Sequence, residues 1–140
     1  MKAQWHVSLG LLLTAAAMLC AASDNSWLQR VPEKDRKKVN PYGRDANAVA
    51  AGAKLFADHC AQCHSTDALG QGKRPSLRTG EVQDASDGEL FWIVRNGYLR
   101  RGMPSWSSLP EESRWQIIAY VKSLGVSPEN HSHDQVQAEK

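Results

Sequence analysis

Three residues that could do chemistry together stand in one short stretch, Cys60-Ala61-Gln62-Cys63-His64. In a helical turn Cys60, Cys63 and His64 occupy positions i, i+3 and i+4 and therefore project from one face. Two thiols at this spacing can form thioether bonds to the two vinyl groups along one edge of a porphyrin, while the adjoining imidazole binds the iron. The C-x-x-C-H spacing is typical of covalent attachment of a c-type haem.

A C-x-x-C pair has two other common uses. A redox dithiol is expected beside a βαβ pattern, and a zinc site needs a second pair of ligands. The sequence indicates neither for Cys60 and Cys63. We therefore favour covalent haem attachment.

Further short motifs accompany this site within Ala46–Gly125. Each is weak alone, but the series resembles class I bacterial cytochromes c. The resemblance covers a little over half of the chain, and it implies an all-α cytochrome c fold with roughly three to five helices wrapped around one covalently bound haem c. The motifs that carry it are Gly52 and Phe56, the pentapeptide above, Pro75, Asp87-Gly88-Glu89-Leu90, Arg95-Asn96-Gly97, Gly102-Met103-Pro104, and Trp115 with Tyr120.

The resemblance also implies that His64 and Met103 bind the haem iron from opposite sides. The local sequence agrees, because Pro104 biases the residue before it toward extended backbone and Gly102 permits a tight approach. The other two methionines lie within the first 22 residues. A methionine met at random is more often core filler than a ligand, and that alternative remains open here.

Pro75 receives a role from the same resemblance. Its backbone carbonyl is expected to accept the Nδ1 proton of His64, which fixes the tautomer and the orientation of the imidazole. The alternative is a proline that only shapes a turn.

Length, composition and charge limit the class of protein and the kinds of partner. The chain has 140 residues, of which 41% are hydrophobic and 23% charged, as in an ordinary soluble protein with one domain. The net charge of +2 excludes no class of partner and gives no reason to expect nucleic-acid binding. A core of about 80 residues is close to the lower limit for a stable fold, and a buried haem would add the missing apolar area.

Capping and apolar periodicity predict three helices. The first is expected from Asn47, as its N-cap, to Cys60; the second from a capping box at Ser86 to Gly97; the third from Pro110 to Leu124. A glycine inside the first helix, at position 52, costs about 1 kcal/mol relative to alanine and suggests a close backbone neighbour. We expect that neighbour to be the last helix near Tyr120.

Two further segments are expected to surround the porphyrin. Residues 65–84 are rich in glycine, proline and serine and are predicted to form a loop on one side of the ring. In the second helix Leu90, Ile93 and Val94 form an apolar i, i+3, i+4 set that should face the ring, although each could instead be ordinary core.

The chain ends are assigned by composition. Residues 1–22 have the layout of a signal peptide, with an uncleaved N-terminal anchor as the alternative, and Cys20 lies in this segment. Residues 23–45 are interpreted as a polar, basic, solvated arm or linker that Trp27 and Tyr42 could pin to the cytochrome c domain at 46–125; the alternative is a basic arm that touches an acidic partner or a membrane surface. Residues 126–140 are predicted to be a disordered tail. Its His131 and His133 could bind a metal, but we do not favour this.

These inferences favour an electron carrier over an enzyme. With His64 and Met103 on the iron, neither oxygen nor peroxide has an open position, and methionine ligation raises the reduction potential. We expect a periplasmic carrier that shuttles electrons between a dehydrogenase or bc1-type donor and a terminal oxidase. Alternatives are a five-coordinate haem enzyme or gas-binding protein, or a cytochrome subunit of a membrane-associated complex.

Basic residues flank the segments expected around the haem edge. If they form a patch, it should steer an acidic redox partner, although an evenly mixed surface is the alternative and some arginines could instead hold the haem propionates. A monomer with no nucleic-acid partner is expected. The basic residues are Lys73, Arg74, Arg78, Arg95, Arg100 and Arg101.

Overall fold

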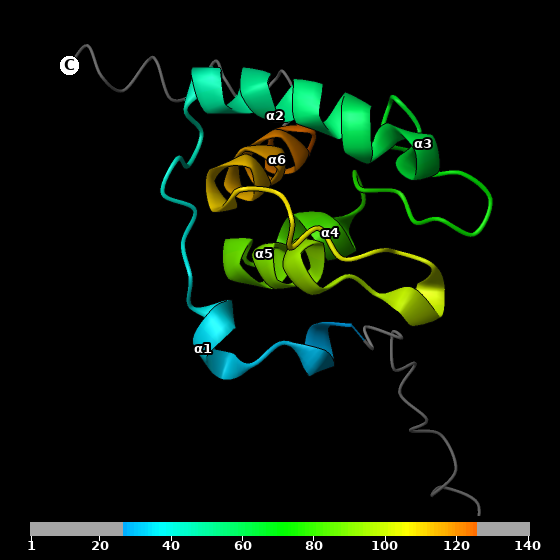
Figure 1. Cartoon of the computed structure of the whole chain (residues 1–140), viewed down its shortest axis with the longest axis horizontal. Coiled ribbons are helices and arrows are strands. Elements are labelled where there is room, and N and C mark those ends of the chain that lie inside the picture. Colours follow the sequence, from blue (N-terminus) through cyan, green and yellow to red (C-terminus); the bar gives the residue numbers. More distant parts are fainter. Residues whose placement is uncertain (1–26, 126–140) are drawn as a thin grey trace, which may run out of the picture.

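The computed structural model describes residues 27–125 (Figure 1). The expected signal peptide at 1–22, with Cys20, and the expected tail at 126–140, with His131 and His133, lie outside the described residues. Between residues 27 and 125 no helix has the length and apolar character needed to span a bilayer.

Helices make up the regular structure of residues 27–125. Their bounds are η1 Leu28–Arg30, α1 Glu33–Arg36, α2 Ala46–His59, α3 Ala61–His64, α4 Gly80–Asp84, α5 Asp87–Asn96, η2 Leu99–Arg101 and α6 Glu111–Ser123. This part of the chain has no strand, only an isolated bridge between Tyr98 and Met103. The expected all-α fold is therefore confirmed, with six α-helices within these residues where three to five were expected. Helices α1, α3 and α4 have no more than five residues each, so that α2, α5 and α6 dominate the architecture.

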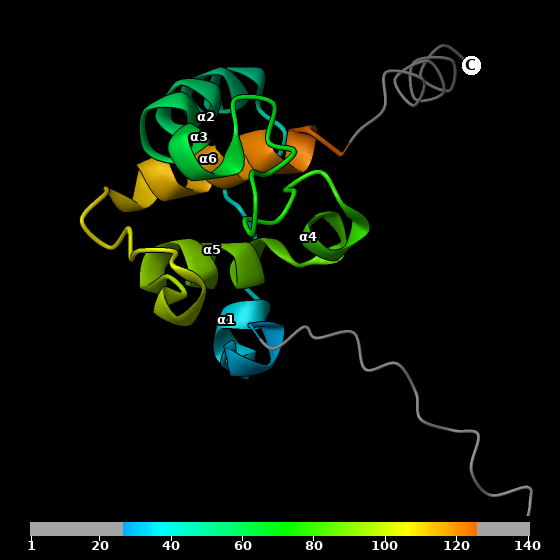
Figure 2. The ribbon, with the colours of Figure 1, turned by 90° about the vertical axis from the view of Figure 1, so that its right-hand side faces the viewer.

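The helices stack in one order in both views of the ribbon. From top to bottom they are α2, α6, α5 and α1 (Figures 1 and 2). The predicted close approach of α2 to the last helix is confirmed at Gly52, where a methyl group would lie 2.6 Å from the carbonyl carbon of Gln116 and 3.0 Å from Cβ of Tyr120. One turn along, the ring of Phe56 lies 5.2 Å from that of Tyr120. The absence of a side chain at Gly52 thus lets α2 and α6 meet.

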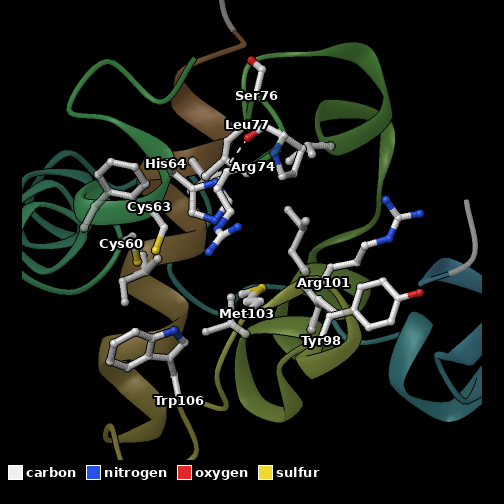
Figure 3. Close-up of a pocket in the computed structure, with 18 of the residues that line it drawn as sticks. Cys60, Cys63, His64, Arg74, Ser76, Leu77, Tyr98, Arg101, Met103 and Trp106 are labelled. Carbon is white, nitrogen blue, oxygen red and sulfur yellow. Dashed lines mark hydrogen bonds between the residues drawn. The ribbon is translucent and has the colours of Figure 1, made fainter. Parts of the chain in front are cut away.

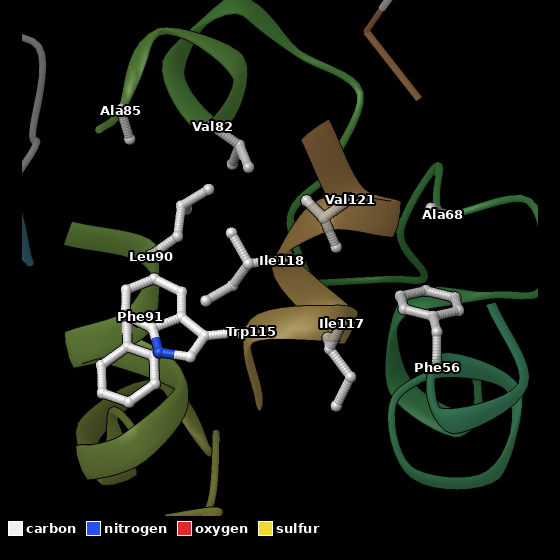
Figure 4. Close-up of a cluster of buried hydrophobic side chains, with 10 residues drawn as sticks. All are labelled: Phe56, Ala68, Val82, Ala85, Leu90, Phe91, Trp115, Ile117, Ile118 and Val121. Atoms are coloured by element: carbon white, nitrogen blue, oxygen red, sulfur yellow. The ribbon is translucent and has the colours of Figure 1, made fainter. Parts of the chain in front are cut away.

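The hydrophobic core lies between α2, α4, α5 and α6 (Figure 4). Phe91 of α5 and Trp115 of α6 stack with their centroids 4.0 Å apart and their planes 21° from parallel. Phe56 and Ile118 are the largest fully buried side chains among the described residues. Since buried aromatic side chains contribute most of the apolar area in a small core, the stacked pair joins α5 firmly to α6.

Helix ends follow local hydrogen-bonding rules. The predicted capping box is confirmed, because the Ser86 hydroxyl accepts from the Glu89 amide at 3.2 Å while the Glu89 carboxylate accepts from the Ser86 amide at 2.8 Å. Asn47 is not the cap of α2. The N-cap is Asp45, two residues earlier than predicted, and its carboxylate accepts from the Ala48 amide at 2.8 Å.

The segment from residue 65 to 84 is only partly a loop. Its last five residues form α4, Gly80–Asp84, where no helix was predicted. The Gln83 side chain accounts for this, because it donates to the carbonyl of Leu77 at 2.8 Å and to that of Val121 at 2.9 Å. A long-range contact with α6 therefore stabilises a turn of helix that the local composition does not favour.

The prediction of a solvated arm before residue 46 is wrong for its described part, residues 27–45. Val31 is 4% exposed, and Asn40, at 5%, donates to the carbonyl oxygen of Trp115 at 2.9 Å. Trp27 and Tyr42 pack against the hydrophobic core, as the sequence suggested. The low apolar content of the segment does not indicate this packing, because polar side chains such as Asn40 make part of the contact with the domain.

Candidate haem site

A cavity of about 420 Å³ opens between α2, α3, α5 and the loops that follow α3 and α5 (Figure 3). Its size falls within the range of about 300–1,000 Å³ that is usual for cofactor sites. The predicted site residues all line it, namely Cys60, Cys63, His64, Pro75 and Met103. The fold thus brings together residues from separate segments of the sequence.

The two cysteines lie where α2 ends and α3 begins. Cys60 is the C-cap of α2, and its carbonyl accepts from the amides of Cys63 at 3.1 Å and His64 at 2.9 Å. Both thiols are free and half-buried. The helical turn presents the two sulfurs and the imidazole toward the same cavity (Figure 3), as the C-x-x-C-H spacing predicted.

Burial changes the acid–base properties of these groups. It raises the pKa of the Cys60 thiol to about 11, with a smaller contribution from nearby Cys63. Burial also lowers the pKa of His64; its contact with Pro75 opposes this effect, and the positive charge of Arg74 adds to it. A neutral imidazole is the form that can bind iron.

His64 is oriented by a backbone carbonyl. Its Nδ1 lies 3.2 Å from the carbonyl oxygen of Pro75, which leaves Nε2 directed into the cavity. Gly70 makes this approach possible, because a methyl group there would lie 2.8 Å from the carbonyl carbon and oxygen of Pro75. The Gly70 amide also donates to the His64 carbonyl at 3.0 Å. The sequence predicted only a loop glycine at position 70, since its positive φ of 85° and its closeness to Pro75 arise on folding.

Met103 reaches the cavity from the opposite side (Figure 3). It lies in what we call the methionine turn, residues 97–107. Its backbone pairs with Tyr98 through two hydrogen bonds of 2.8 and 3.1 Å. A methyl group at Gly97 would lie 2.7 Å from the Met103 carbonyl oxygen, so glycine is needed for the turn to close on itself.

Three further hydrogen bonds hold the methionine turn to α5 and α6. The Ser105 hydroxyl donates to the carbonyl of Arg95 at 2.6 Å, and the Trp106 amide donates to that of Val94 at 3.0 Å. From α6, the guanidinium of Arg114 donates to the Ser107 carbonyl at 3.1 Å. The thioether of Met103 is therefore presented by a braced segment.

Apolar side chains form the walls of the cavity. Leu90, Ile93 and Val94 of α5 line it, as predicted, and α2 and α6 contribute further apolar groups. Residues that the sequence did not assign to the site also line it: Trp27, Phe56, Leu77, Val82, Tyr98, Trp106, Ile117, Ile118 and Val121. Phe56 belongs to the motifs of the resemblance, aromatic character was the only sequence signal for Trp27, Tyr98 and Trp106, and the aliphatic residues gave none.

Positive side chains stand at the rim. Lys73, Arg74 and Arg101 line the cavity and are exposed, whereas Arg78, Arg95 and Arg100 are exposed elsewhere. Glu81 is also at the rim. The predicted basic surface is therefore divided, with half of its members at the cavity.

The residues present fit a covalently bound haem. The large apolar walls of the cavity match the porphyrin ring, and the two thiols on one side match its vinyl groups. One imidazole and one thioether match an iron that accepts a nitrogen and a soft sulfur ligand. Within residues 27–125 no group of three or more His, Cys, Asp or Glu side chains is placed to hold a different metal ion.

Comparison with known proteins gives consistent matches. A family model described as cytochrome c oxidase, cbb3-type, subunit III matches residues 47–121. Cytochrome c550 of Pseudomonas aeruginosa is 33% identical over 90 residues, which cover 61% of this chain and 62% of that protein. The cbb3-type cytochrome c oxidase subunit CcoP of Rubrivivax gelatinosus is 30% identical over 90 residues, covering 62% of this chain and 29% of that protein.

A third relative is the quinohemoprotein alcohol dehydrogenase ADH-IIG of Pseudomonas putida, 36% identical over 93 residues that cover 64% of this chain and 12% of that protein. This chain spans less than two thirds of the length of each of these relatives. Among solved structures, cytochrome CL of Methylophaga aminisulfidivorans MPT is similar, with a TM-score of 0.54 and 26% identity, over 67% of this chain and 70% of that one.

Proposed function

Because the chain belongs to the cytochrome c family described as cytochrome c oxidase, cbb3-type, subunit III, we propose that it is a periplasmic single-electron carrier. Its cytochrome c domain carries one covalently attached haem c and takes part in electron transfer. To this we add, as proposals, the iron ligands, a role as carrier and not as enzyme, the location and the kinds of partner.

In this proposal Cys60 and Cys63 hold the ring through thioether bonds, and His64 and Met103 bind the iron. The observation that carries it is that His64 and Met103 extend into one cavity from opposite sides (Figure 3). Bound haem supplies reversible one-electron chemistry at the iron. The chain keeps His64 in one orientation through Pro75 and holds Met103 by the braced methionine turn.

Ligation on both sides excludes small molecules from the iron. A carrier needs no open position, whereas an oxygen-using or gas-binding haem protein does. The apolar walls and the thioether both favour the reduced form of the iron and so raise the reduction potential. We therefore propose electron delivery at high potential, from a dehydrogenase or bc1-type donor to a terminal oxidase.

Absorption spectra and intact mass of the mature holoprotein test this proposal. The oxidised wild type should show the near-infrared methionine-to-iron charge-transfer band, and its mass should include one haem. Met103→Ala should lose that band while keeping the covalent haem, and Cys60→Ser with Cys63→Ser should lose covalent attachment. Rapid carbon monoxide binding by the native reduced wild type would contradict the proposed ligation.

The rim charges suggest the chemistry of the partner. Lys73, Arg74 and Arg101 at the cavity would attract an acidic surface, with Glu81 as the opposing charge. Such steering weakens as ionic strength rises. Stopped-flow reduction rates with an acidic redox protein should fall with salt, and Lys73→Gln should lower both the rate and its salt dependence. A rate independent of salt would remove the electrostatic part of the proposal.

A second candidate is a cytochrome subunit of a membrane-associated complex. It is favoured by relatives in which a similar segment forms only a part, such as CcoP. We propose residues 1–22 as a cleaved signal, 46–125 as the cytochrome domain and 126–140 as a tail; an uncleaved N-terminus would instead anchor the protein. Fractionation of cells, with the N-terminal sequence of the mature protein, distinguishes the free carrier from the anchored subunit.

A further inference from the structure

Part of the cavity wall comes from outside the family match. The match begins at residue 47, but the cavity also contains Trp27, well before it in the sequence. Trp27 begins a segment that we call the N-terminal strap, residues 27–40. Figures 1 and 2 both show the strap running beneath α5, on the side away from α2.

The N-terminal strap is fixed to α5 by close backbone packing. A methyl group at Gly88 would lie 3.0 Å from the carbonyl carbon of Asp35 and from the amide nitrogen of Lys38, so only glycine permits this approach. Arg36 pairs with the Glu89 carboxylate and donates to the carbonyl of Leu28. The strap therefore has its own internal contacts and its own attachment to the domain.

The other end of the strap is anchored at Asn40. Its side chain donates to the Trp115 carbonyl, and its amide donates to the Asp87 carboxylate at 3.1 Å. These contacts reach α6 and α5 respectively. The strap thus spans the lower face of the domain between two fixed points.

Two side chains of the strap are linked to the cavity: Trp27 lines it, and Arg30 contacts a residue that lines it. The indole Nε1 of Trp27 donates to the Glu81 carboxylate at 3.3 Å, and both residues line the cavity. The guanidinium of Arg30 lies over the ring of Tyr98, 5.2 Å from its centroid. Tyr98 in turn pairs with Met103. Trp27 thereby connects the strap to α4, and Arg30 connects it to the methionine turn.

The strap contacts fall on one side of the cavity. Figure 3 shows Tyr98 and Arg101 beside the strap ribbon, across the cavity from Cys60 and Cys63. A ring tethered at the cysteines would direct its opposite edge toward this side. Trp27 lines the cavity on this side, beside Glu81 of α4, whereas Arg30 lies behind the lining, against the ring of Tyr98.

We propose that the N-terminal strap is a wall of the haem site, with Trp27 covering the ring edge opposite the cysteines and Arg30 steadying the methionine turn. This rests on the proposed function. Covering that edge disfavours the oxidised iron, which carries the larger positive charge and gains more from water. The strap therefore keeps the reduction potential high.

Replacement of Trp27 tests the covering role in the holoprotein. Trp27→Ala should shift the reduction potential downward in a spectroelectrochemical titration. Trp27→Phe, which keeps a ring but loses the N–H donor, should retain most of the wild-type potential. Gln29→Ala, at an exposed position on η1, whose N-cap is Trp27, is the matched control and should leave the potential unchanged. Equal potentials in Trp27→Ala and wild type would overturn the proposal.

Replacement of Arg30 tests the contact with the methionine turn. An exposed cation–π contact is worth about 0.5–1 kcal/mol, so Arg30→Gln should raise the affinity of the oxidised protein for added imidazole about two- to fivefold. Gln29→Ala should match wild type. An unchanged affinity would refute the role of Arg30. Failure of the proposed function can be distinguished from failure of the strap proposal. If the proposed function is wrong, the wild-type protein itself lacks the haem or the methionine-to-iron charge-transfer band.

Discussion

Gly52→Ala is the substitution that most directly tests how the fold builds the site. A methyl group at position 52 would lie 2.6 Å from the carbonyl carbon of Gln116 and nearer still to its oxygen. Ordinary contact begins at 3.4 Å, so the shortfall from the carbon alone is about 0.8 Å. Neither atom belongs to a flexible side chain. Relief therefore requires α2 to move away from α6.

The expected cost combines two opposed effects. Alanine improves helix propensity by about 1 kcal/mol, whereas overpacking against rigid backbone costs about 3 kcal/mol, the upper end of the usual range. The net loss of stability is about 2 kcal/mol. For a domain of this size that corresponds to a fall in Tm of about 8–16 °C. Because Cys60 ends α2, the yield of haem-bearing protein should also fall.

Thermal unfolding of holoprotein, followed by far-ultraviolet circular dichroism, measures this loss. The matched control is Gly80→Ala, where the nearest atom to an added methyl is the Asp84 carboxylate oxygen at an acceptable 3.4 Å. That variant should be as stable as wild type or gain up to about 1 kcal/mol. If Gly52→Ala proved as stable as Gly80→Ala, the close helix approach at this position would be disproved.

Three further outcomes follow from local contacts. Ser86→Ala should lower the free energy of unfolding by about 1–3 kcal/mol, because it removes the capping box and the hydrogen bond that the hydroxyl donates to the Arg36 carbonyl at 3.0 Å; Ser86→Asp should restore only the cap, about 1 kcal/mol, both in urea titrations. Asn40→Ala should cost about 1–3 kcal/mol, because it leaves the Trp115 carbonyl without this donor, whereas exposed Val39→Ala should be nearly neutral. The Leu69 amide, which donates to Asp67, holds the pKa of that carboxyl below its usual value. The resulting stabilisation is present at pH values above the pKa of Asp67 in the unfolded chain, and it is lost as the pH falls through the lower pKa of Asp67 in the folded protein. NMR titration should show a low Asp67 pKa in the native protein, and a normal value would contradict this.

The features predicted best from sequence are those set by nearby residues. The helical presentation of Cys60, Cys63 and His64 and the capping box at Ser86 depend on residues no more than four positions apart. The close packing at Gly52 was predictable because glycine is unfavourable inside a helix unless another backbone needs the space. The order of the motifs also placed Met103 at the same cavity as the pentapeptide. The iron ligands themselves remain a proposal.

The features that sequence did not predict depend on distant partners. Helix α4 is held by Gln83 against the end of α6, and the segment before residue 46 is held in part by the buried hydrogen bond that Asn40 donates to Trp115. Hydrophobic periodicity does not predict either contact, because polar side chains make them. The part played by Trp27 in the cavity could not be predicted either, since no local pattern indicates which distant wall a lone tryptophan reaches.

The bracing of the methionine turn bears on the speed of electron exchange. Ser105, Trp106 and Arg114 connect this turn to two helices that are themselves joined through the aromatic stack. Under the proposed ligation, the sulfur keeps nearly the same position whether the iron is ferric or ferrous. The nuclei then move little when an electron arrives or leaves, and this small reorganisation energy permits fast transfer even when donor and acceptor differ only slightly in potential.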